Sequence, residues 1–420
     1  MIPQGYKHTE LGVIPQKWEI LPLSALGKIY SGGTPDTTNP KFWNGEILWC
    51  TPSDITSLSS NYISDTEGKI TEEGLKKSSA IILPAGSLIV CTRATIGNIA
   101  IATKPLSTNQ GFKNIVPNNE ISVEWLFYNL LSAKNRLVKL GCGSTFLEVS
   151  KKDFERFRVA VPPMEEQRKI AEVLGVWDKA IELQARIIDK LELRKRALMQ
   201  RLLSGRHRLP GFSASWQKVK LSEAGGFLSS NTLSRDKLNY DNGIFQNIHY
   251  GDILIHYPAI VNPDIEIIPY INEDTAISSD LLKNGDIIFA DTAEDNTAGK
   301  AIEIINADTR KITAGLHTIA FRPNNGMFAI PFLGYYINST DYQQQLEPLI
   351  QGIKVCSISK SAIKGTYLQV PSLAEQAAIS EVLSTADKEI KLAKAKLAAY
   401  RTQKRGLMQQ LLTGKKRVKL

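Results

Sequence analysis

Hydrophobic residues recur in steps of three and four along two long stretches of the chain. One stretch follows Pro163 and ends at Gly205, and the other follows Pro371 and ends at Gly414. This spacing places the apolar side chains in a narrow stripe that needs one partner helix. We predict two helices that pair through a helix–helix seam of Ile170, Leu174, Trp177, Ile181, Ile188, Leu191, Leu198, Leu202, Ile379, Leu383, Ile390, Leu397, Tyr400, Leu407 and Leu411.

The two stretches are copies of one another. Val161 and Val370 open the copies, and the offset of 370 − 161 = 209 residues holds without a gap to their ends. At about 1.5 Å per residue, some 40 residues make a rod of roughly 60 Å. The duplication of seam and ends together argues against two unrelated amphipathic helices on separate cores.

Both helices carry end signals. Ser372 with Glu375 predicts a capping box. Gly205 and Gly414 predict left-handed residues at the C-terminal caps. We expect the register to be fixed by the polar residues that interrupt the seam, which are Gln184, Lys195 and Lys404.

The segments before the helices are also duplicated. Trp18 matches Trp216 at an offset of 198, and we match Gly111 with Gly315 at an offset of 204. The second copy should therefore carry extra residues between Asp291 and Gly315. Copies that share a scaffold and differ in loops are typical of binding domains with diverged specificity, although neutral drift would give the same pattern.

The fold class that we predict is mixed α+β, with two globular domains (residues 1–160 and 206–369), each followed by a long helix (161–205 and 370–420). In the first domain we expect strands at Ser87–Thr92, Ile99–Ala102 and Phe112–Val116 and a helix at Ser122–Leu140. In the second we expect strands at Ile287–Ala290, Ala301–Ile305 and His317–Phe321 and a helix at about Ala329–Gln345.

The charge balance favours a polyanionic partner. The net charge is +9 and the pI is about 9.1, and no acidic residue follows Glu389. The alternative is that these cations complement helix dipoles and solvate the tail. The sequence predicts no transmembrane helix or signal peptide, and four scattered cysteines without a Cys-x-x-Cys pair indicate a reducing cytoplasm.

No catalytic constellation emerges from the sequence. Asn39-Pro40-Lys41-Phe42 resembles the Asn-Pro-Pro-aromatic motif of amino-methyltransferases, but lacks its second proline and a preceding glycine-rich turn. The five histidines are solitary and show no metal-ligand spacing. We therefore predict no active site, no metal and no cofactor in this chain.

The duplicated pattern resembles the specificity subunit of type I restriction-modification systems over essentially the whole chain. Pro-Pro-Met-Glu-Glu-Gln at 162–167 and Pro-Ser-Leu-Ala-Glu-Gln at 371–376 look like the helix starts of that family. Ile14-Pro15-Gln16-Lys17-Trp18 resembles the opening of its target-recognition domains. Gly32-Gly33-Thr34-Pro35 resembles a variant loop of these domains, whereas Ser229–Thr232 stands at that place in the second half.

The resemblance implies that each domain reads one half of a bipartite site on double-stranded DNA. The two helices would then form an antiparallel coiled coil that separates the domains and sets the gap. Two modification (methyltransferase) subunits, which bind S-adenosylmethionine, would dock onto the helices and domains for DNA methylation. Restriction subunits with translocase and nuclease activity would complete the complex, and this chain itself would be non-catalytic.

Polar and basic loop residues are the expected DNA contacts, because Arg and Lys suit guanine and Asn and Gln suit adenine. For each of them a plain surface or turn role is the alternative, and Trp43 and Trp49 also suit a core. The predicted contacts are Lys41, Trp43, Thr92, Arg93, Asn109, Gln110, Lys113, Asp291, Thr292, Asn296, Lys300 and His317. Two rival functions stay open, a coiled-coil scaffold that binds only proteins and a solitary methyltransferase or nuclease.

Overall fold

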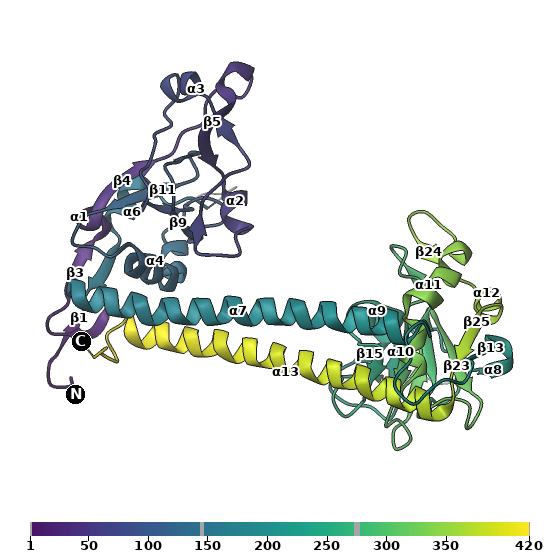
Figure 1. The fold of residues 1–420 in the computed structure, drawn as a ribbon. Helices are drawn as coiled ribbons and strands as arrows, with labels where there is room; N and C mark the ends of the chain where they lie inside the picture. Colours follow the sequence, from purple (N-terminus) through teal and green to yellow (C-terminus); the bar gives the residue numbers. More distant parts are fainter. Residues whose placement is uncertain (1, 143–146, 273–277, 420) are drawn as a thin grey trace. The chain divides into compact units, whose positions relative to one another are not determined.

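The computed structural model describes residues 2–142, 147–272 and 278–419 (Figure 1). The chain divides into two compact units. Unit 1 comprises the described residues up to Ala185 together with those from Ala395 onward, and unit 2 comprises Arg186–Lys394. Each unit therefore holds one globular domain and one part of each long helix.

A five-stranded sheet organises unit 1, in the order β4-β11-β8-β9-β6. Only β6 runs parallel to its neighbour, β9. The strands of unit 1 are β1 (Tyr6–Thr9), β2 (Gly12–Pro15), β3 (Glu19–Pro22), β4 (Gly27–Ser31), β5 (Trp43–Cys50), β6 (Tyr62–Ile63), β7 (Lys69–Ile70), β8 (Leu88–Val90), β9 (Ile99–Ala102), β10 (Ser107–Thr108), β11 (Lys113–Pro117) and β12 (Arg158–Val161). Its short helices are α1 (Leu23–Leu26), η1 (Pro40–Phe42), α2 (Pro52–Thr56), α3 (Glu72–Lys76), α4 (Val123–Ser132), α5 (Lys134–Val138) and α6 (Lys151–Arg156).

Unit 2 repeats this sheet in the order β14-β23-β19-β21-β17. Its strands are β13 (Gln217–Lys220), β14 (Gly225–Phe227), β15 (Leu238–Asn239), β16 (Gln246–Ile248), β17 (Ile260–Val261), β18 (Tyr270–Ile271), β19 (Ile287–Ala290), β20 (Thr292–Ala293), β21 (Ala301–Ile304), β22 (Ile312–Ala314), β23 (Thr318–Pro323), β24 (Cys356–Ser357) and β25 (Tyr367–Val370). Its short helices are α8 (Leu221–Ala224), η2 (Arg235–Lys237), α9 (Tyr250–Ile255), α10 (Leu333–Ile337), α11 (Thr340–Leu346), η3 (Glu347–Leu349) and α12 (Lys360–Lys364). The long helices are α7 (Met164–Leu202) and α13 (Leu373–Leu411).

The predicted strands of both domains are confirmed within a residue or two, but each predicted domain helix is divided. In unit 1 the break falls at Ala133, whose ψ of 4° lies outside the helical range. In unit 2 the side chain of Asn338 donates to the carbonyl oxygen of Gly334 and so ends α10, and Ser339 then caps α11. Neither break has a proline or glycine to mark it in the sequence.

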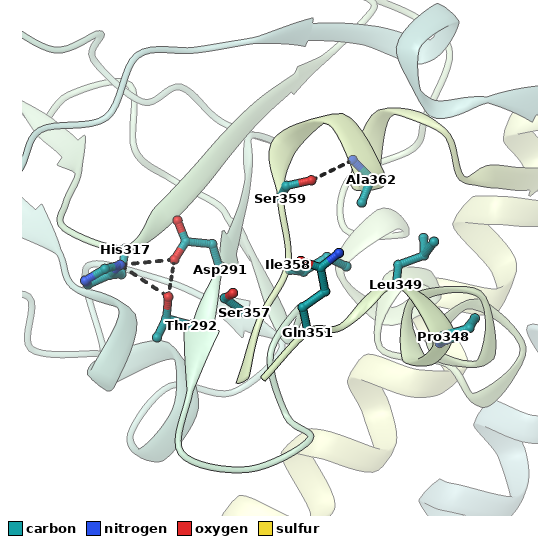
Figure 2. Close-up of a pocket in the computed structure, with 10 residues that line it drawn as sticks. All are labelled: Asp291, Thr292, His317, Pro348, Leu349, Gln351, Ser357, Ile358, Ser359 and Ala362. Atoms are coloured by element: carbon teal, nitrogen blue, oxygen red, sulfur yellow. Dashed lines mark hydrogen bonds and ion pairs between the residues drawn. The ribbon is translucent and has the colours of Figure 1, made fainter. Parts of the chain in front are cut away.

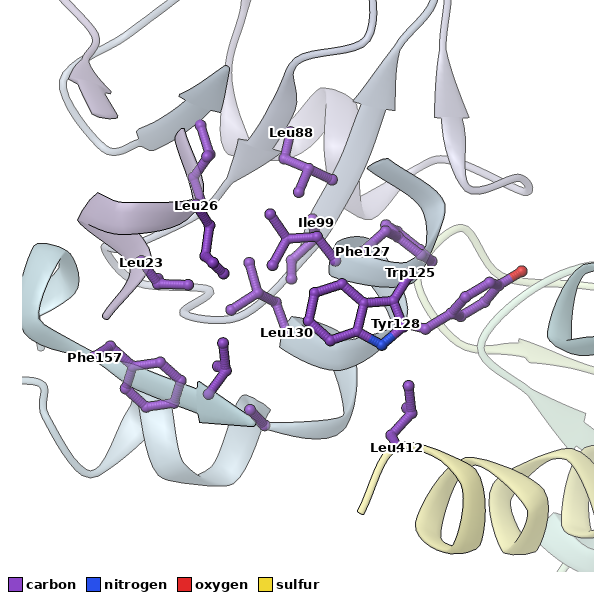
Figure 3. Packing of buried hydrophobic residues seen from close by; sticks show 14 of the residues in the cluster. Leu23, Leu26, Leu88, Ile99, Trp125, Phe127, Tyr128, Leu130, Phe157 and Leu412 are labelled. Atoms are coloured by element: carbon purple, nitrogen blue, oxygen red, sulfur yellow. The ribbon is translucent and has the colours of Figure 1, made fainter. Parts of the chain in front are cut away.

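The largest buried cluster of unit 1 lies between the sheet and α4 (Figure 3). Leu88 and Ile99 of the sheet belong to the same buried cluster as Trp125 and Leu130 of α4. The cluster also includes Leu412, just beyond the end of α13. In unit 2 the corresponding cluster includes Leu202 and Leu203, at the end of α7, so each domain core is completed by the helix of the other copy.

The long helices pair antiparallel in each unit. In unit 1, Asp178 of α7 accepts from Lys404 of α13, and the Trp177 and Tyr400 rings lie 5.7 Å apart. Unit 2 repeats the arrangement, with Lys195 2.5 Å from Asp387 and Glu192 2.7 Å from Lys394. Lys195 and Lys404, two of the residues predicted to fix the register, each form an ion pair with an aspartate of the other helix, and their role in fixing the register stays a prediction.

The seam differs from the prediction at its ends. Ile170 and Leu174 belong to the core cluster of unit 1, and Ile379 and Leu383 belong to that of unit 2. These residues therefore pack into a globular domain as well as toward a partner helix. A heptad pattern reports burial but does not name the element that covers it.

The helix caps also differ in part from the prediction. Gly205 and Gly414 adopt left-handed φ values of 68° and 71°, which confirms the C-terminal caps. The hydroxyl of Ser372 accepts the N–H of Glu375 at 3.4 Å, but the Glu375 carboxylate bonds Arg208 and Trp216 instead of completing a capping box. The buried Glu375 carboxylate therefore accepts from the guanidinium of Arg208 and the indole N–H of Trp216, and not from a backbone N–H at the start of the helix.

The sheet register corrects one match between the copies. The N–H of Thr92 donates to the carbonyl oxygen of Gly111, and the N–H of Asp291 donates to that of His317. Gly111 therefore corresponds to His317, and the predicted match with Gly315 is wrong by two residues. None of the helices in the described part of the chain is long and apolar enough to cross a membrane.

Candidate nucleic-acid interface

Two cavities lie at corresponding places in the two units. In each, the segment that follows the central strand, β8 or β19, meets the residue that precedes the neighbouring strand, β11 or β23. The cavity of unit 1 has a volume of about 300 Å³ and that of unit 2 about 510 Å³. The duplicated scaffold thus places a polar cavity at the same end of both sheets.

The unit 1 cavity brings three of the predicted contacts together. It is lined by Pro52, Arg93, Ala94, Asn109, Gln110 and Gly111. The Arg93 side chain is 45% exposed and forms an ion pair with Glu148 at 3.9 Å. The Oδ1 of Asn109 accepts the N–H of Gly111 at 2.9 Å, which leaves the amide hydrogens of Asn109 to point elsewhere.

The Gly-Gly-Thr-Pro loop packs against this cavity segment. A Cβ at Gly32 would lie 1.9 Å from the carbonyl oxygen of Asn109, so the loop needs glycine there for close approach. The hydroxyl of Thr34 bonds the side chain of Gln110. The loop therefore supports the cavity, which gives its sequence motif a physical role.

The other predicted contacts of unit 1 lie outside the cavity. Thr92 is buried and its hydroxyl donates to Gly111, so a direct base contact by Thr92 does not fit this structure. Lys113 is also buried, with its ammonium 3.4 Å from Glu148. Lys41 is exposed on η1, while Trp43 packs edge-on against Trp49, with ring centroids 4.9 Å apart.

The unit 2 cavity joins Asp291, Thr292 and His317 (Figure 2). The Thr292 hydroxyl lies 2.7 Å from Oδ1 of Asp291 and 3.2 Å from Nδ1 of His317. Nδ1 of His317 also lies 3.3 Å from Oδ1 of Asp291. The remaining lining residues are Pro348, Leu349, Gln351, Ser357, Ile358, Ser359 and Ala362.

Two predicted contacts of unit 2 do not line this cavity. Asn296 is exposed in the loop between β20 and β21. The ammonium of Lys300 donates to the carbonyl oxygen of Leu254 at 2.8 Å, and burial lowers its pKa. Lys300 is therefore used inside the domain.

Sequence reasoning missed the second wall of the unit 2 cavity. Gln351, Ser357 and Ser359 come from the segment around β24. Ser359-Lys360 repeats Ser150-Lys151 at the offset of 209, which marks this region as duplicated but gives no sign that it lines a cavity together with the end of β19. Tyr250 was missed as well, and its ring lies 5.2 Å from that of His317.

Backbone strain occurs at both cavities. Ala94 and His317 adopt left-handed φ values of 59° and 52°, which non-glycine residues rarely do. Such strain concentrates at functional sites, where surrounding contacts hold it in place. Asn44 and Asn306 also have left-handed φ values and line neither cavity, so this backbone conformation alone does not identify a binding site.

Each domain is tied to both long helices by a polar cluster. In unit 1 the Tyr128 hydroxyl donates to Asp178 at 2.6 Å, and Lys404 bonds the same carboxylate. In unit 2, Tyr335 donates to Asp387 at 2.8 Å and Lys195 bonds it at 2.5 Å. The offset of 209 relates Asp178 to Asp387 and Lys195 to Lys404, so the two clusters are reciprocal.

Within the described residues, no group of three or more His, Cys, Asp or Glu side chains could hold a metal ion. The trio in the unit 2 cavity also lacks the geometry of a catalytic relay. Asp291 and Thr292 both meet the same ring nitrogen of His317. In a relay the carboxylate and the hydroxyl use opposite ring nitrogens.

Comparisons with known proteins identify the family. A family model described as type I restriction modification DNA specificity domain matches residues 15–193 and 215–399. The MjaIX type I restriction enzyme specificity subunit of Methanocaldococcus jannaschii is 38% identical over 45% of this chain and 45% of that protein. The MjaVIII specificity subunit of the same organism is 24% identical over 97% of this chain and 94% of that protein.

A solved structure agrees on the fold. It concerns complex assembly and conformational transition of the type I restriction-modification system, and matches with a TM-score of 0.63 at 18% identity, over 96% of this chain and 99% of that chain. The chain spans less than half the length of relatives such as MjaIX in their alignments. The family model nevertheless matches well over half of the chain in two segments, and the chain therefore belongs to the type I restriction-modification DNA specificity family.

Proposed function

We propose that this chain is the specificity subunit of a type I restriction-modification complex and that each unit reads one half of a bipartite DNA site. The observation that carries the proposal is the pair of cavities, which share one place in the scaffold and differ in their polar side chains. Base edges are distinguished by donors and acceptors in the major groove, so different cavities on one frame would read different half-sites.

The charge distribution supports binding to DNA phosphates. Arg417 and Lys404 are held by Glu166 and Asp178, so part of the basic C-terminal segment serves the fold. Other basic residues of this segment are exposed, namely Arg401, Arg405, Lys415, Lys416 and Lys419. Exposed cations of this kind release counterions when they meet phosphates, which favours association.

The remaining components of the complex also belong to the proposal. Two modification subunits that carry S-adenosylmethionine would dock on the helices and domains, and restriction subunits would join them. The specificity subunit itself would be non-catalytic. The free thiols of Cys50, Cys91, Cys142 and Cys356 fit a reducing cytoplasm.

The test is to express the chain with the modification subunits of its own system and to map the methylated bases of the host DNA. We expect one bipartite motif with a fixed gap. Purified complex should bind a duplex with that motif, and log K should fall linearly with log salt concentration with a slope of several units. Absence of a motif, with salt-independent or undetectable duplex binding, would favour the protein-scaffold alternative.

A further inference from the structure

The hydrogen-bond inventory of the unit 2 cavity centres on Asp291. Its Oδ1 accepts a hydrogen bond from the Thr292 hydroxyl at 2.7 Å and lies 3.3 Å from Nδ1 of His317. Within the described part of the chain, its Oδ2 has no hydrogen-bond partner, and 27% of the side chain is exposed. Figure 2 shows that both contacts meet one carboxylate oxygen and leave the other uncommitted.

The walls of this cavity carry no permanent positive charge. The lining residues include neither Lys nor Arg, and His317 offsets the carboxylate charge only when its ring is protonated. Guanine presents two acceptors, O6 and N7, in the major groove, and phosphate oxygens are acceptors as well. Oδ2 would repel the guanine acceptors and the phosphate oxygens, so this site suits neither guanine nor phosphate.

Resting on the proposed function, we propose that Asp291 reads a cytosine through the exocyclic amino group at N4. The amino group is a donor without an adjacent acceptor on the cytosine edge, which suits an acceptor-only carboxylate. Adenine places the N7 acceptor beside its amino group and is matched by Asn or Gln, which carry both a donor and an acceptor. Thr292 and His317 act as positioning residues because they hold Oδ1 and so orient Oδ2.

The unit 1 cavity has the opposite polarity. Arg93 stands at the position that corresponds to Thr292, and a guanidinium can only donate. Its natural partner is the acceptor pair of guanine. The two cavities would therefore impose different base requirements on the two half-motifs, and a change in one cavity should leave the other half-motif intact.

The experiment compares methylated motifs of the complete complex with wild-type chain, Asp291→Asn and Asp295→Asn. Asp291→Asn keeps the shape but replaces Oδ2 or Oδ1 by a donor. We expect one cytosine position in one half-motif to lose at least about fivefold of its discrimination, or to shift toward adenine, while the other half-motif is unchanged. Arg93→Gln should alter the other half-motif, which assigns each half to its unit.

Asp295→Asn is the matched control. Asp295 lies four residues further on, in the loop between β20 and β21, where it bonds Thr297 and does not line the cavity, so the same charge change should leave both half-motifs unaltered. A thermal melt of Asp291→Asn shows whether the chain is folded. Thr292→Val is a second variant, which leaves the carboxylate in place and should relax the same cytosine position less strongly.

The outcomes separate this inference from the proposed function. A wild-type bipartite motif that stays equally stringent in Asp291→Asn would overturn the cytosine contact and leave the proposed function standing. The cytosine contact would also be overturned if the half-motif that Asp291→Asn alters consisted only of A·T pairs, because it would then contain no cytosine. If the wild-type complex gives no bipartite motif at all, it is the proposed function that fails.

Discussion

At the scale of single residues, matched positions of the two copies carry very different chemistry. Strand register makes Ile101 of β9 the counterpart of Glu303 of β21, because each pairs with the corresponding residue of the central strand. Glu303 is 1% exposed, and its carboxylate accepts the N–H of Gly334 at 2.7 Å. Burial raises the pKa of Glu303 to about 8.

This raised pKa predicts a pH-dependent stability. Glu303 is protonated in both states below pH 4.5, its ordinary pKa, whereas between 4.5 and about 8 only the folded chain keeps the proton. The free energy of unfolding should therefore fall as the pH rises through this window, by up to about 1.4 kcal/mol per pH unit. Glu303→Gln keeps an acceptor for the N–H of Gly334. This variant should remove most of the pH dependence of the melting temperature of unit 2 between pH 5 and 8, whereas substitution of an exposed residue, Glu294→Gln, should leave that dependence unchanged. Parallel curves for wild type and Glu303→Gln would refute this origin.

The sequence named residue types suited to DNA but not their exposure. Arg93, Asn109 and Gln110 converge on one cavity, and Asp291, Thr292 and His317 on the other. Thr92 and Lys113 have the same polar character, yet strand pairing turns them inward. Which neighbour faces outward depends on register between distant strands, and periodicity within one short strand cannot supply that. The base contacts themselves stay a prediction.

At the scale of elements, the long helices were the most predictable part of the chain. Their 39-residue lengths, their glycine caps and their seam all follow from local spacing. Local spacing could not show that the ends of the helices also pack into the domain cores. The tyrosines that reach Asp178 and Asp387 escaped notice for the same reason, because Tyr128 and Tyr335 come from separate helices of the domains.

The reciprocal polar clusters predict a measurable coupling. Asp178→Ala and Lys404→Ala each leave a partly buried partner uncompensated, so each should lower the melting temperature of unit 1 by a few degrees. The double variant should lose about 1 kcal/mol less than the sum of the single losses, since both remove one interaction. The Lys394–Glu192 pair, with side chains 58% and 43% exposed, is the control and should show coupling near zero. If the stability losses of Asp178→Ala and Lys404→Ala simply add up in the double variant, the two side chains are not energetically coupled and this prediction is wrong.

At the scale of the whole molecule, the compact units do not coincide with the sequence repeats. The unit boundary falls before Arg186 in α7 and before Ala395 in α13, and 395 − 186 = 209 is the repeat offset. Each repeat therefore gives the end of its helix to the other unit, where Leu202 and Leu411 are buried. A repeat in sequence identifies the duplicated segment, but it does not reveal which copy covers which core.

The long helices give the proposed function a testable ruler. One heptad inserted in each helix, after Leu191 and after Tyr400, keeps the seam pattern and leaves the cavities of both units untouched. Each helix lengthens by about 10 Å, which is near three base pairs at roughly 3.4 Å per step. If the helices set the gap, the methylated motif should keep both half-motifs while its gap grows by about three base pairs.

The insertion also carries a rotational cost. Three base pairs turn the second half-site by about 100° around the duplex, given roughly 10.5 pairs per turn, so either DNA or protein must twist and methylation should slow. Shorter insertions that break the seam pattern would test this cost separately, since they change phase and length by different amounts. An insertion of four residues in each helix lengthens it by about 6 Å, or near two base pairs. A gap that stays fixed in the heptad variant, or a change of bases within either half-motif, would refute the ruler.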